Sequence, residues 1–330
     1  MKKRFIAVLL SAAMLSVGML AGAADDQTSQ TASVYSPYSI GEQATVIKML
    51  MKSGLYSEMT VKTDTYEKLV LHFGPDTLLM DTQTGTMATE SDIKDGDKVF
   101  VYYDEAMNQS EPPQTGLQAV LVNLDDKKTP AHLLTAESIV YNTNSGPTVQ
   151  AENGTLLLTL PANVPISPLA TKQVASLGDI RMGTRFFAWY DAVALSMPGQ
   201  ATAAKVVLPP QNDQNFTIIH EGDIAIAEGR IEHGVAMVPA RKVAETLGFK
   251  VTWNGKDQSV HLANDTRQTT VYLGEDLYNY SSVQAIGMSA PMSLGAAAYE
   301  VDGVSWVPAE LFALLLGENS LQLIDTVLYL

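Results

Sequence analysis

Two stretches of this chain carry matching residues at a constant separation, and this repeat constrains the fold more than any other feature. The segment 92–104 aligns without gaps to the segment 179–191, at an offset of 87 residues. Asp, Ile, Gly, Phe, Tyr and Asp recur at matching positions, and Lys98 faces Arg185. Repetition at a fixed period indicates one structural unit used more than once, so we predict two copies of a unit about 85 residues long.

The content of each copy indicates strands. Upstream of the aligned segments, Leu69–Leu71 falls on Leu156–Leu158 at the same offset. The Asp95-Gly96 pair is a turn signal, and the alternating residues after it are typical of a strand. About five short strands in each copy favour a small β-barrel, OB-like in its strand number. We therefore predict β-rich repeats at residues 42–124 and 125–209, which form either two barrels or one joint sandwich.

Aromatic residues gather on the strand that follows the turn in each copy. OB-type barrels use such rings as stacking platforms for bases or sugars. The alternative is structural, with half of the rings inside the barrel and half packed on a neighbouring sheet face. The basic residues that nucleic acid requires are missing around these rings, so a glycan is the ligand class that stays open. The possible ligand-stacking residues are Tyr102, Tyr103, Trp189 and Tyr190, beside Phe100 and Phe187.

The N-terminus has the three parts of a secretory signal peptide. Residues 2–4 form a basic head, residues 5–20 carry no charge, and small residues follow at 21–24. The uncharged stretch is about 16 residues long, shorter than the roughly 20 that a membrane-spanning helix needs. We therefore predict a signal peptide at 1–24, a mature chain with no transmembrane segment, and a Ser/Thr/Gln-rich flexible linker at 25–41.

The composition narrows the kinds of site and partner. The chain has no cysteine, which excludes disulfides, thiolate metal sites and a lipid anchor on cysteine. It carries 36 acidic and 21 basic side chains, and its formal net charge of −15 becomes −18 once Lys2, Lys3 and Arg4 leave with the signal peptide. Such a surface keeps an exported protein soluble. It disfavours nucleic acid, anionic membranes and anionic wall polymers as partners.

A second pattern occupies the C-terminal third of the chain. Residues 235–238 form a short apolar run, and Pro239 suits the first turn of a helix because it has no N–H to satisfy. Gly248 is placed to end that helix in a left-handed conformation. The alternating residues at 249–253 then predict a strand that ends in Trp253, and the Asn-Gly pair at 254–255 signals a hairpin.

The same order of signals recurs 69 residues later, where Gly303–Gly317 falls on Gly234–Gly248. This alignment places Pro308 at the start and Gly317 at the end of a second helix. The second helix has more apolar residues than the first. We therefore expect it to be the more deeply buried of the two.

In order, this part of the chain has a strand, Val-Pro-Ala-Arg, a helix, Leu-Gly, a Val-Thr-Trp-Asn hairpin, and then a second Val-Pro, helix and Leu-Gly. This order resembles the copper amine oxidase N-terminal-like domain, often called a stalk domain. The resemblance covers about residues 220–320, and we set the domain at 218–330, after a linker at 210–217. It implies an α+β fold with an antiparallel sheet and two short helices. It also implies an accessory role without chemistry, in exported envelope proteins of Gram-positive-type bacteria.

One residue departs from the family pattern. Glu310 stands where the second half often keeps a basic residue, as the first half does at Arg241. Arg241 lies just inside the first helix, so we expect it to tie that helix to the sheet. The motif and structural residues of the domain are Pro239, Arg241, Gly248, Trp253, Pro308 and Gly317.

The sequence carries no recognisable catalytic constellation. It has no cysteine nucleophile, no Gly-x-Ser-x-Gly turn and no Gly-rich phosphate loop. No histidine has another at two or four positions, the spacings that place two imidazoles on one face of a strand or helix. The five histidines are His72, His132, His220, His233 and His261. We therefore predict no catalytic residue, no cofactor and no metal site.

These patterns together predict a multi-domain protein with two β-rich repeats followed by an α+β stalk domain. We expect it to be a secreted or envelope-associated bacterial protein without enzymatic activity. Its expected role is a binding or spacer module, with an envelope protein or a glycan as partner. One alternative is a carbohydrate-binding protein that uses the aromatic strands. A second alternative is a wall hydrolase of uncharacterised type, which requires two convergent carboxylates within residues 42–209.

Overall fold

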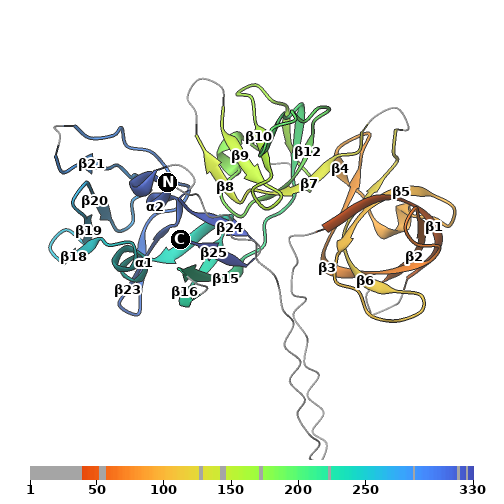
Figure 1. Ribbon diagram of the computed structural model, residues 1–330, viewed down its shortest axis with the longest axis horizontal. Helices are drawn as coiled ribbons and strands as arrows, with labels where there is room; N and C mark the ends of the chain where they lie inside the picture. Colours follow the sequence, from red (N-terminus) through yellow and green to blue (C-terminus); the bar gives the residue numbers. More distant parts are fainter. Residues whose placement is uncertain are drawn as a thin grey trace, which may run out of the picture. The chain divides into compact units, whose positions relative to one another are not determined.

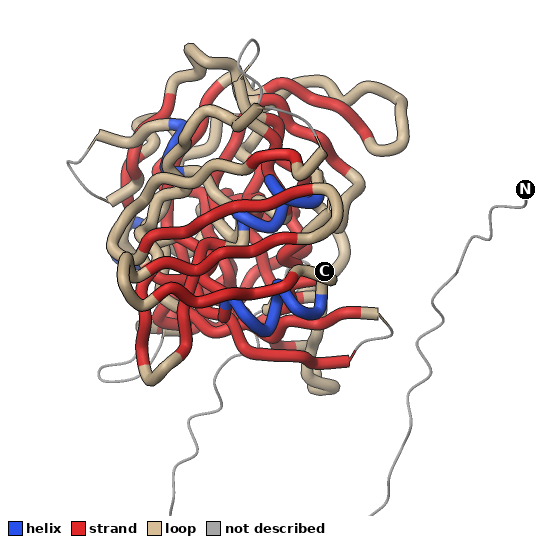
Figure 2. The backbone as a smooth tube through the Cα atoms, turned by 90° about the vertical axis from the view of Figure 1, so that its left-hand side faces the viewer, coloured by secondary structure: helices blue, strands red, loops and turns tan. Residues whose placement is uncertain are grey.

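Strands make up most of the regular structure, and the two α-helices of the described residues are short (Figure 1, Figure 2). The computed structural model describes residues 39–51, 57–125, 129–141, 146–170, 174–221, 224–284, 287–317, 320–324 and 326–330, and these belong to one compact unit. The predicted signal peptide and the part of the predicted linker before residue 39 lie outside the described residues. Within the described ranges, no helix is long and apolar enough to cross a membrane.

The first β unit is a closed barrel of five strands. The order around the barrel is β1, β2, β3, β6, β5 and back to β1, and β3 runs parallel to β6 while the other neighbours are antiparallel. Alternate residues face the core, as Val99, Val101 and Tyr103 do on β5. The strands are β1 (Ser39–Leu50), β2 (Glu58–Thr63), β3 (Leu69–Asp81), the short β4 (Thr86–Met87), β5 (Lys98–Asp104) and β6 (Gln114–Val122).

The second β unit is built from two four-stranded sheets. One has the order β13-β10-β9-β8 and the other β11-β14-β12-β7. Pro161 and Pro165 lie between β10 and β11, and neither can donate a ladder hydrogen bond, so the strand is interrupted there. The strands are β7 (His132–Thr135), β8 (Ser138–Val140), β9 (Thr148–Ala151), β10 (Leu156–Thr159), β11 (Ile166–Pro168), β12 (Arg185–Trp189), β13 (Gly199–Thr202) and β14 (Lys205–Leu208).

Each β unit has its own hydrophobic core, and a smaller apolar cluster is shared between them. Met80, Tyr102 and Leu121 of the first unit pack in this cluster with Phe187 and Val207 of the second. The separate cores show that the two units are not the two halves of one sandwich. Each unit also has a single 3-10 turn, η1 (Glu90–Asp92) and η2 (Leu177–Asp179), among its described residues.

The C-terminal domain combines a seven-stranded sheet, a four-stranded sheet and two helices. The large sheet has the order β22-β23-β17-β16-β15-β25-β24, and the small one β18-β19-β20-β21. The strands are β15 (Gln214–His220), β16 (Ile224–Glu232), β17 (Val235–Pro239), β18 (Lys250–Asn254), β19 (Ser259–Ala263), β20 (Arg267–Tyr272), β21 (Ser281–Ser282), β22 (Tyr299–Val301), β23 (Val304–Pro308), β24 (Gln322–Ile324) and β25 (Val327–Tyr329).

The two helices follow β17 and β23, as the sequence pattern predicts. They are α1 (Ala240–Thr246) and α2 (Glu310–Leu316). Leu311, Phe312 and Leu315 of α2 expose at most 2 % of their surface, in a core that also takes Val243 and Ala244 of α1. Both helices therefore contribute apolar residues to one core.

Three details differ from the sequence-based expectation. The large sheet is not wholly antiparallel, because β15 runs parallel to β25. The predicted linker at 210–217 overlaps β15, which begins at Gln214, and the predicted linker at 25–41 overlaps the first residues of β1. Strand partners distant in sequence, such as β15 and β25, leave no local signal in either strand.

Candidate functional site

The rings predicted to stack on a ligand are mostly packed inside the protein. Tyr102, Tyr103 and Tyr190 expose 7 %, 1 % and 6 % of their surface. Trp189 is half-buried, with the Lys205 ammonium 4.7 Å from its ring centroid. Three of the four rings thus offer no open face to a glycan, and the stacking prediction rests on Trp189 alone.

Tyr102 has a structural contact that explains its burial. Its hydroxyl donates to the Ala131 carbonyl at 2.6 Å, within the cluster shared by the two β units. We expect Tyr102→Phe to lower the free energy of unfolding by about 1 kcal/mol, because a buried carbonyl loses its donor. Urea unfolding followed by tryptophan fluorescence measures this change. Tyr272→Phe, at a ring that is 41 % exposed, is the control, and an equally small effect at both positions would contradict the assignment.

The motif residues of the C-terminal domain lie at the ends of its two strand–helix units. Pro239 is the last residue of β17, and Pro308 is the last residue of β23. Gly248 follows α1 with φ of 80°, and Gly317 ends α2 with φ of 108°. Glycine adopts this left-handed region without the steric cost that other residues meet, so both glycines allow the chain to leave the helix.

Arg241 lies at the surface and not between helix and sheet. Its Nη1 contacts Glu245 Oε1 at 3.2 Å, one turn further along α1, and both side chains are more than half exposed. The contact expected between α1 and the sheet is therefore replaced by an exposed pair within α1. Exposed pairs at this spacing contribute only about 0.3–0.5 kcal/mol.

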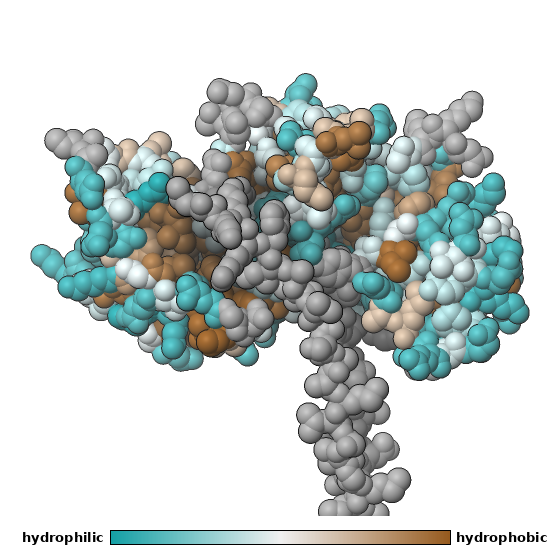
Figure 3. Space-filling view, in the orientation of Figure 1, coloured by the Kyte–Doolittle hydropathy of each residue, from teal (hydrophilic) through white to brown (hydrophobic). Residues whose placement is uncertain are grey.

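A groove of about 460 Å³ lies beside the first turn of α1, and we call it the Trp253 groove. Trp253 of β18 and Val304 of β23 line it and expose 43 % and 39 % of their surface. Figure 3 shows apolar surface on this domain. The groove is also lined by Pro239, Ala240, Arg241, Lys242, Val251, Val260, Glu300, Gly303 and Ser305.

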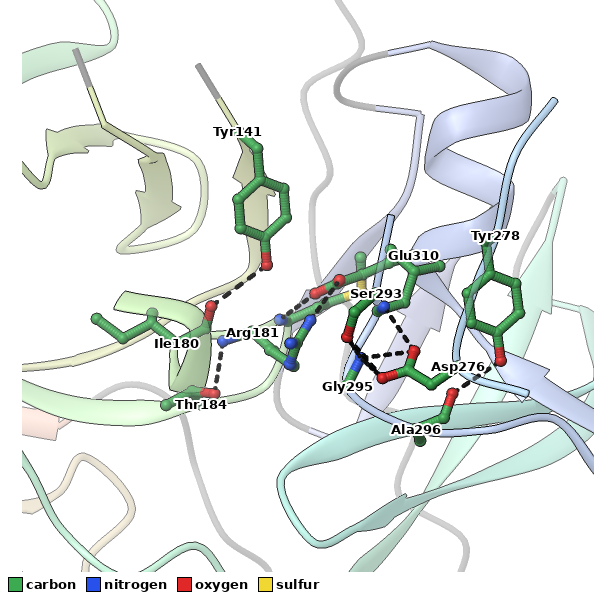
Figure 4. A network of polar contacts seen from close by, with 12 residues as sticks. Tyr141, Ile180, Arg181, Thr184, Asp276, Tyr278, Ser293, Gly295, Ala296 and Glu310 are labelled. Atoms are coloured by element: carbon green, nitrogen blue, oxygen red, sulfur yellow. Dashed lines mark hydrogen bonds and ion pairs between the residues drawn. The ribbon is translucent and has the colours of Figure 1, made fainter. Parts of the chain in front are cut away.

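A second polar feature is a buried ion pair between the second β unit and the C-terminal domain (Figure 4). Arg181 Nη1 lies 3.6 Å from Glu310 Oε2, and the two side chains are 14 % and 8 % exposed. The Met182 N–H donates to Glu310 Oε1 at 3.0 Å. Burial raises the pKa of Glu310, while the Met182 N–H and the Arg181 charge oppose that shift. The Tyr141 hydroxyl opposes the shift as well, so the carboxylate faces one cation, one backbone donor and one tyrosine.

A loop of the C-terminal domain supports the Arg181 side chain from the other side. Asp276 accepts hydrogen bonds from the backbone N–H groups of Leu294 and Gly295 and from the Ser293 hydroxyl (Figure 4). Gly295 has φ of 93°, a conformation that other residues rarely adopt, and a Cβ added there would overlap the Arg181 guanidinium. Glycine therefore lets the loop approach the guanidinium closely.

Two carboxylates of the second β unit, Glu137 and Glu152, interact: burial raises the pKa of both, and the Glu152 charge raises that of Glu137 further. Glu137 is 4 % exposed, and its carboxylate accepts hydrogen bonds from the N–H groups of Asn153 and Gly154 in the turn between β9 and β10. Burial raises the pKa of Glu137, and these two donors oppose the shift. In the described ranges, no group of three or more His, Asp or Glu side chains is placed to hold a metal ion.

The sequence reasoning missed the role of Arg181 and noted Glu310 only as a departure from a family pattern. The available signal was a single carboxylate in the first turn of an otherwise apolar helix. A charge at such a position needs a buried partner. Its partner lies 129 residues earlier in the chain and could not be identified from spacing.

Comparison with known proteins bears on the C-terminal domain. Residues 223–320 match the family model of the copper amine oxidase N-terminal domain. The match runs from the start of β16 to just after α2, and it confirms the resemblance inferred from the motif. The copper amine oxidase N-terminal domain is a non-catalytic, stalk-like unit, and no catalytic domain of that family is matched. No curated protein and no solved structure matches the chain.

Proposed function

We propose that this chain is an exported, non-catalytic spacer module of the bacterial cell envelope. The matched copper amine oxidase N-terminal domain supports a role without chemistry. The basic and apolar leader at 1–24 supports export. The spacer role is supported by the way the second β unit and the C-terminal domain share buried contacts.

The observation that carries the spacer role is the junction around Met182. Met182 belongs to the second β unit by sequence, yet its side chain packs in the core of the C-terminal domain with Ile231 and Leu323. The Leu323 N–H donates to the Glu137 carbonyl at 2.8 Å. Domains move relative to one another unless a large apolar interface joins them, so an apolar core shared across the junction favours a rigid connection.

We further infer that both β units are variants of one OB-like barrel. The pairs β7–β12, β9–β10 and β12–β14 of the second unit have the same directions as β1–β5, β2–β3 and β5–β6 of the first. The parallel pairs β10–β13 and β11–β14 take the place of β3–β6. Repeated units of this kind extend a module's length without requiring a ligand site in each.

Rigidity is testable because the chain has no native cysteine. Spin labels at Thr202→Cys and Lys256→Cys, both at exposed positions, report the distance between the second β unit and the C-terminal domain. We expect one narrow distance distribution in pulsed electron spin resonance. The same label pair in an Arg181→Met background should give a broader distribution. A broad distribution in the unmodified background would contradict the spacer role.

Export is tested separately by expressing the full chain in a Gram-positive host. We expect the protein outside the cytoplasm, with an N-terminus at Ala24 or Asp25. Purified protein should release no product from peptidoglycan. Retention in the cytoplasm with Met1 intact would contradict the envelope role, and turnover of peptidoglycan would favour the hydrolase alternative.

A further inference from the structure

The loop between β12 and β13 carries apolar side chains that point into solvent. Leu195 and Met197 are 108 % and 88 % exposed, and Val193 is 47 % exposed. We call residues 191–198 the apolar loop. Burying a side chain of this kind is favourable relative to leaving it in water, so exposed apolar clusters mark contact surfaces.

The corresponding loop of the first β unit shows that folding does not require these side chains. The Asn108 N–H donates to the Gln114 carbonyl at 2.9 Å, and the Ala194 N–H donates to the Gln200 carbonyl at 2.8 Å. Ser110 Oγ donates to the Pro112 carbonyl and Ser196 Oγ to the Pro198 carbonyl, both at 2.7 Å. The two loops therefore share one backbone arrangement.

The residues that differ between the loops are the exposed ones. With the hydrogen bonds aligned, Gln109 stands at the place of Leu195 and Glu111 at the place of Met197, and both are exposed. The same backbone is compatible with polar residues, so local structure does not explain the apolar ones. A contact made by the second loop and not by the first explains them.

The Trp253 groove has the complementary properties. Its volume of about 460 Å³ lies in the range of pockets that enclose several side-chain-sized groups. Its exposed apolar side chains, Trp253 and Val304, are stabilised when a partner covers them and removes them from water. In this structure the apolar loop is in solvent and thus not in the groove of its own chain.

Charge favours the same pairing. Arg241, Lys242 and Glu300 are exposed and line the groove, so its lining carries two positive charges and one negative charge, in a chain whose formal net charge is −15. Asp191, at the base of the apolar loop, is exposed. A loop with an acidic base thus fits a groove whose lining has a net positive charge.

We propose that the apolar loop of one molecule binds in the Trp253 groove of a second copy of this chain. Loop and groove are different surfaces, so the contact is heterologous and leaves one loop and one groove free in each dimer. Repetition of the contact joins copies head to tail, in an open chain or a ring. The inference does not depend on export or on the spacer role.

The test uses residues 25–330, the predicted mature chain, in sedimentation velocity from about 5 to 500 μM. We expect the sedimentation coefficient to rise with concentration, as head-to-tail association requires. The double variant L195Q/M197E, which takes the residues of the first loop, should weaken association at least about tenfold, as should the groove variant V304E. V174Q removes an apolar side chain that is 94 % exposed elsewhere and should leave association unchanged.

A mixture of the two variants distinguishes this contact from others. L195Q/M197E keeps an intact groove and V304E keeps an intact loop, so the equimolar mixture should form a dimer and stop there. Monomeric wild-type protein throughout the range, or unaltered association in both variants, would overturn the proposal. So would wild-type capture by phosphatidylcholine vesicles that depends on Leu195 and Met197 without dependence on Val304, because the loop then binds a lipid surface.

Discussion

Arg181→Met is expected to lower the free energy of unfolding by about 3 kcal/mol at pH 7, because it leaves the Glu310 carboxylate buried without its cation. Methionine keeps most of the apolar stem but removes the guanidinium that lies beside Gly295, so both the charge and some packing change. Urea unfolding measures the effect. The matched control is Arg241→Met, which breaks an exposed pair and should cost about 0.5 kcal/mol or less.

A second substitution separates loss of charge compensation from loss of packing. Glu310→Gln retains an oxygen to accept the Met182 N–H and carries no charge. We therefore expect Arg181→Met/Glu310→Gln to be more stable than Arg181→Met alone. If the double variant is as unstable as the single one, the pair acts through packing and the electrostatic explanation fails.

The cost of Arg181→Met is also expected to depend on pH. Burial raises the pKa of Glu310 above its ordinary value of 4.5, and the Arg181 charge opposes this shift, so removing Arg181 raises the pKa further. Between the unfolded and folded pKa values the folded state binds more protons, and stability therefore falls as the pH rises. The deficit of Arg181→Met should be smaller at pH 5 than at pH 7. An equal deficit at both pH values would contradict this mechanism.

Features that depend on neighbouring residues were predictable from the sequence. The Val-Pro segments before both helices, the glycines after them and the Asn-Gly turn are local signals, and each lies where the structure has a strand end, a helix end or a hairpin. The small number of helices also follows from the alternation of apolar residues in most segments. Residues 223–320 could be assigned to a family for the same reason.

Features that depend on distant partners were not predictable. Tyr102 and Tyr103 are consecutive residues of β5 and point to opposite faces, yet both are buried. Tyr103 packs in the barrel core, while Tyr102 packs in the cluster shared with the second β unit. The alternation of residues indicates which side chains share a face of β5. It does not indicate which part of the protein covers the outer face. The Arg181–Glu310 pair and the exposure of the apolar loop also depend on tertiary structure, so the sequence alone does not predict them.

Phe312→Ala is expected to lower the free energy of unfolding by about 3–5 kcal/mol, the second large effect in this chain. Phe312 of α2 is fully buried in the core of the copper amine oxidase N-terminal domain, where Leu262 and Val243 also pack. Removing the ring therefore loses its burial and leaves a cavity that the surrounding sheets cannot fill completely.

Leu316→Ala is the matched control for Phe312→Ala, because it truncates an apolar residue one turn later on the same helix. Leu316 is 38 % exposed and should cost about 1 kcal/mol or less. Thermal unfolding by calorimetry and urea unfolding by circular dichroism measure both variants. Because the junction at Met182 joins this core to the second β unit, Phe312→Ala should also lower the stability of that unit. Unfolding of the C-terminal domain alone, with the second β unit unchanged, would contradict a shared core and weaken the case for a rigid spacer.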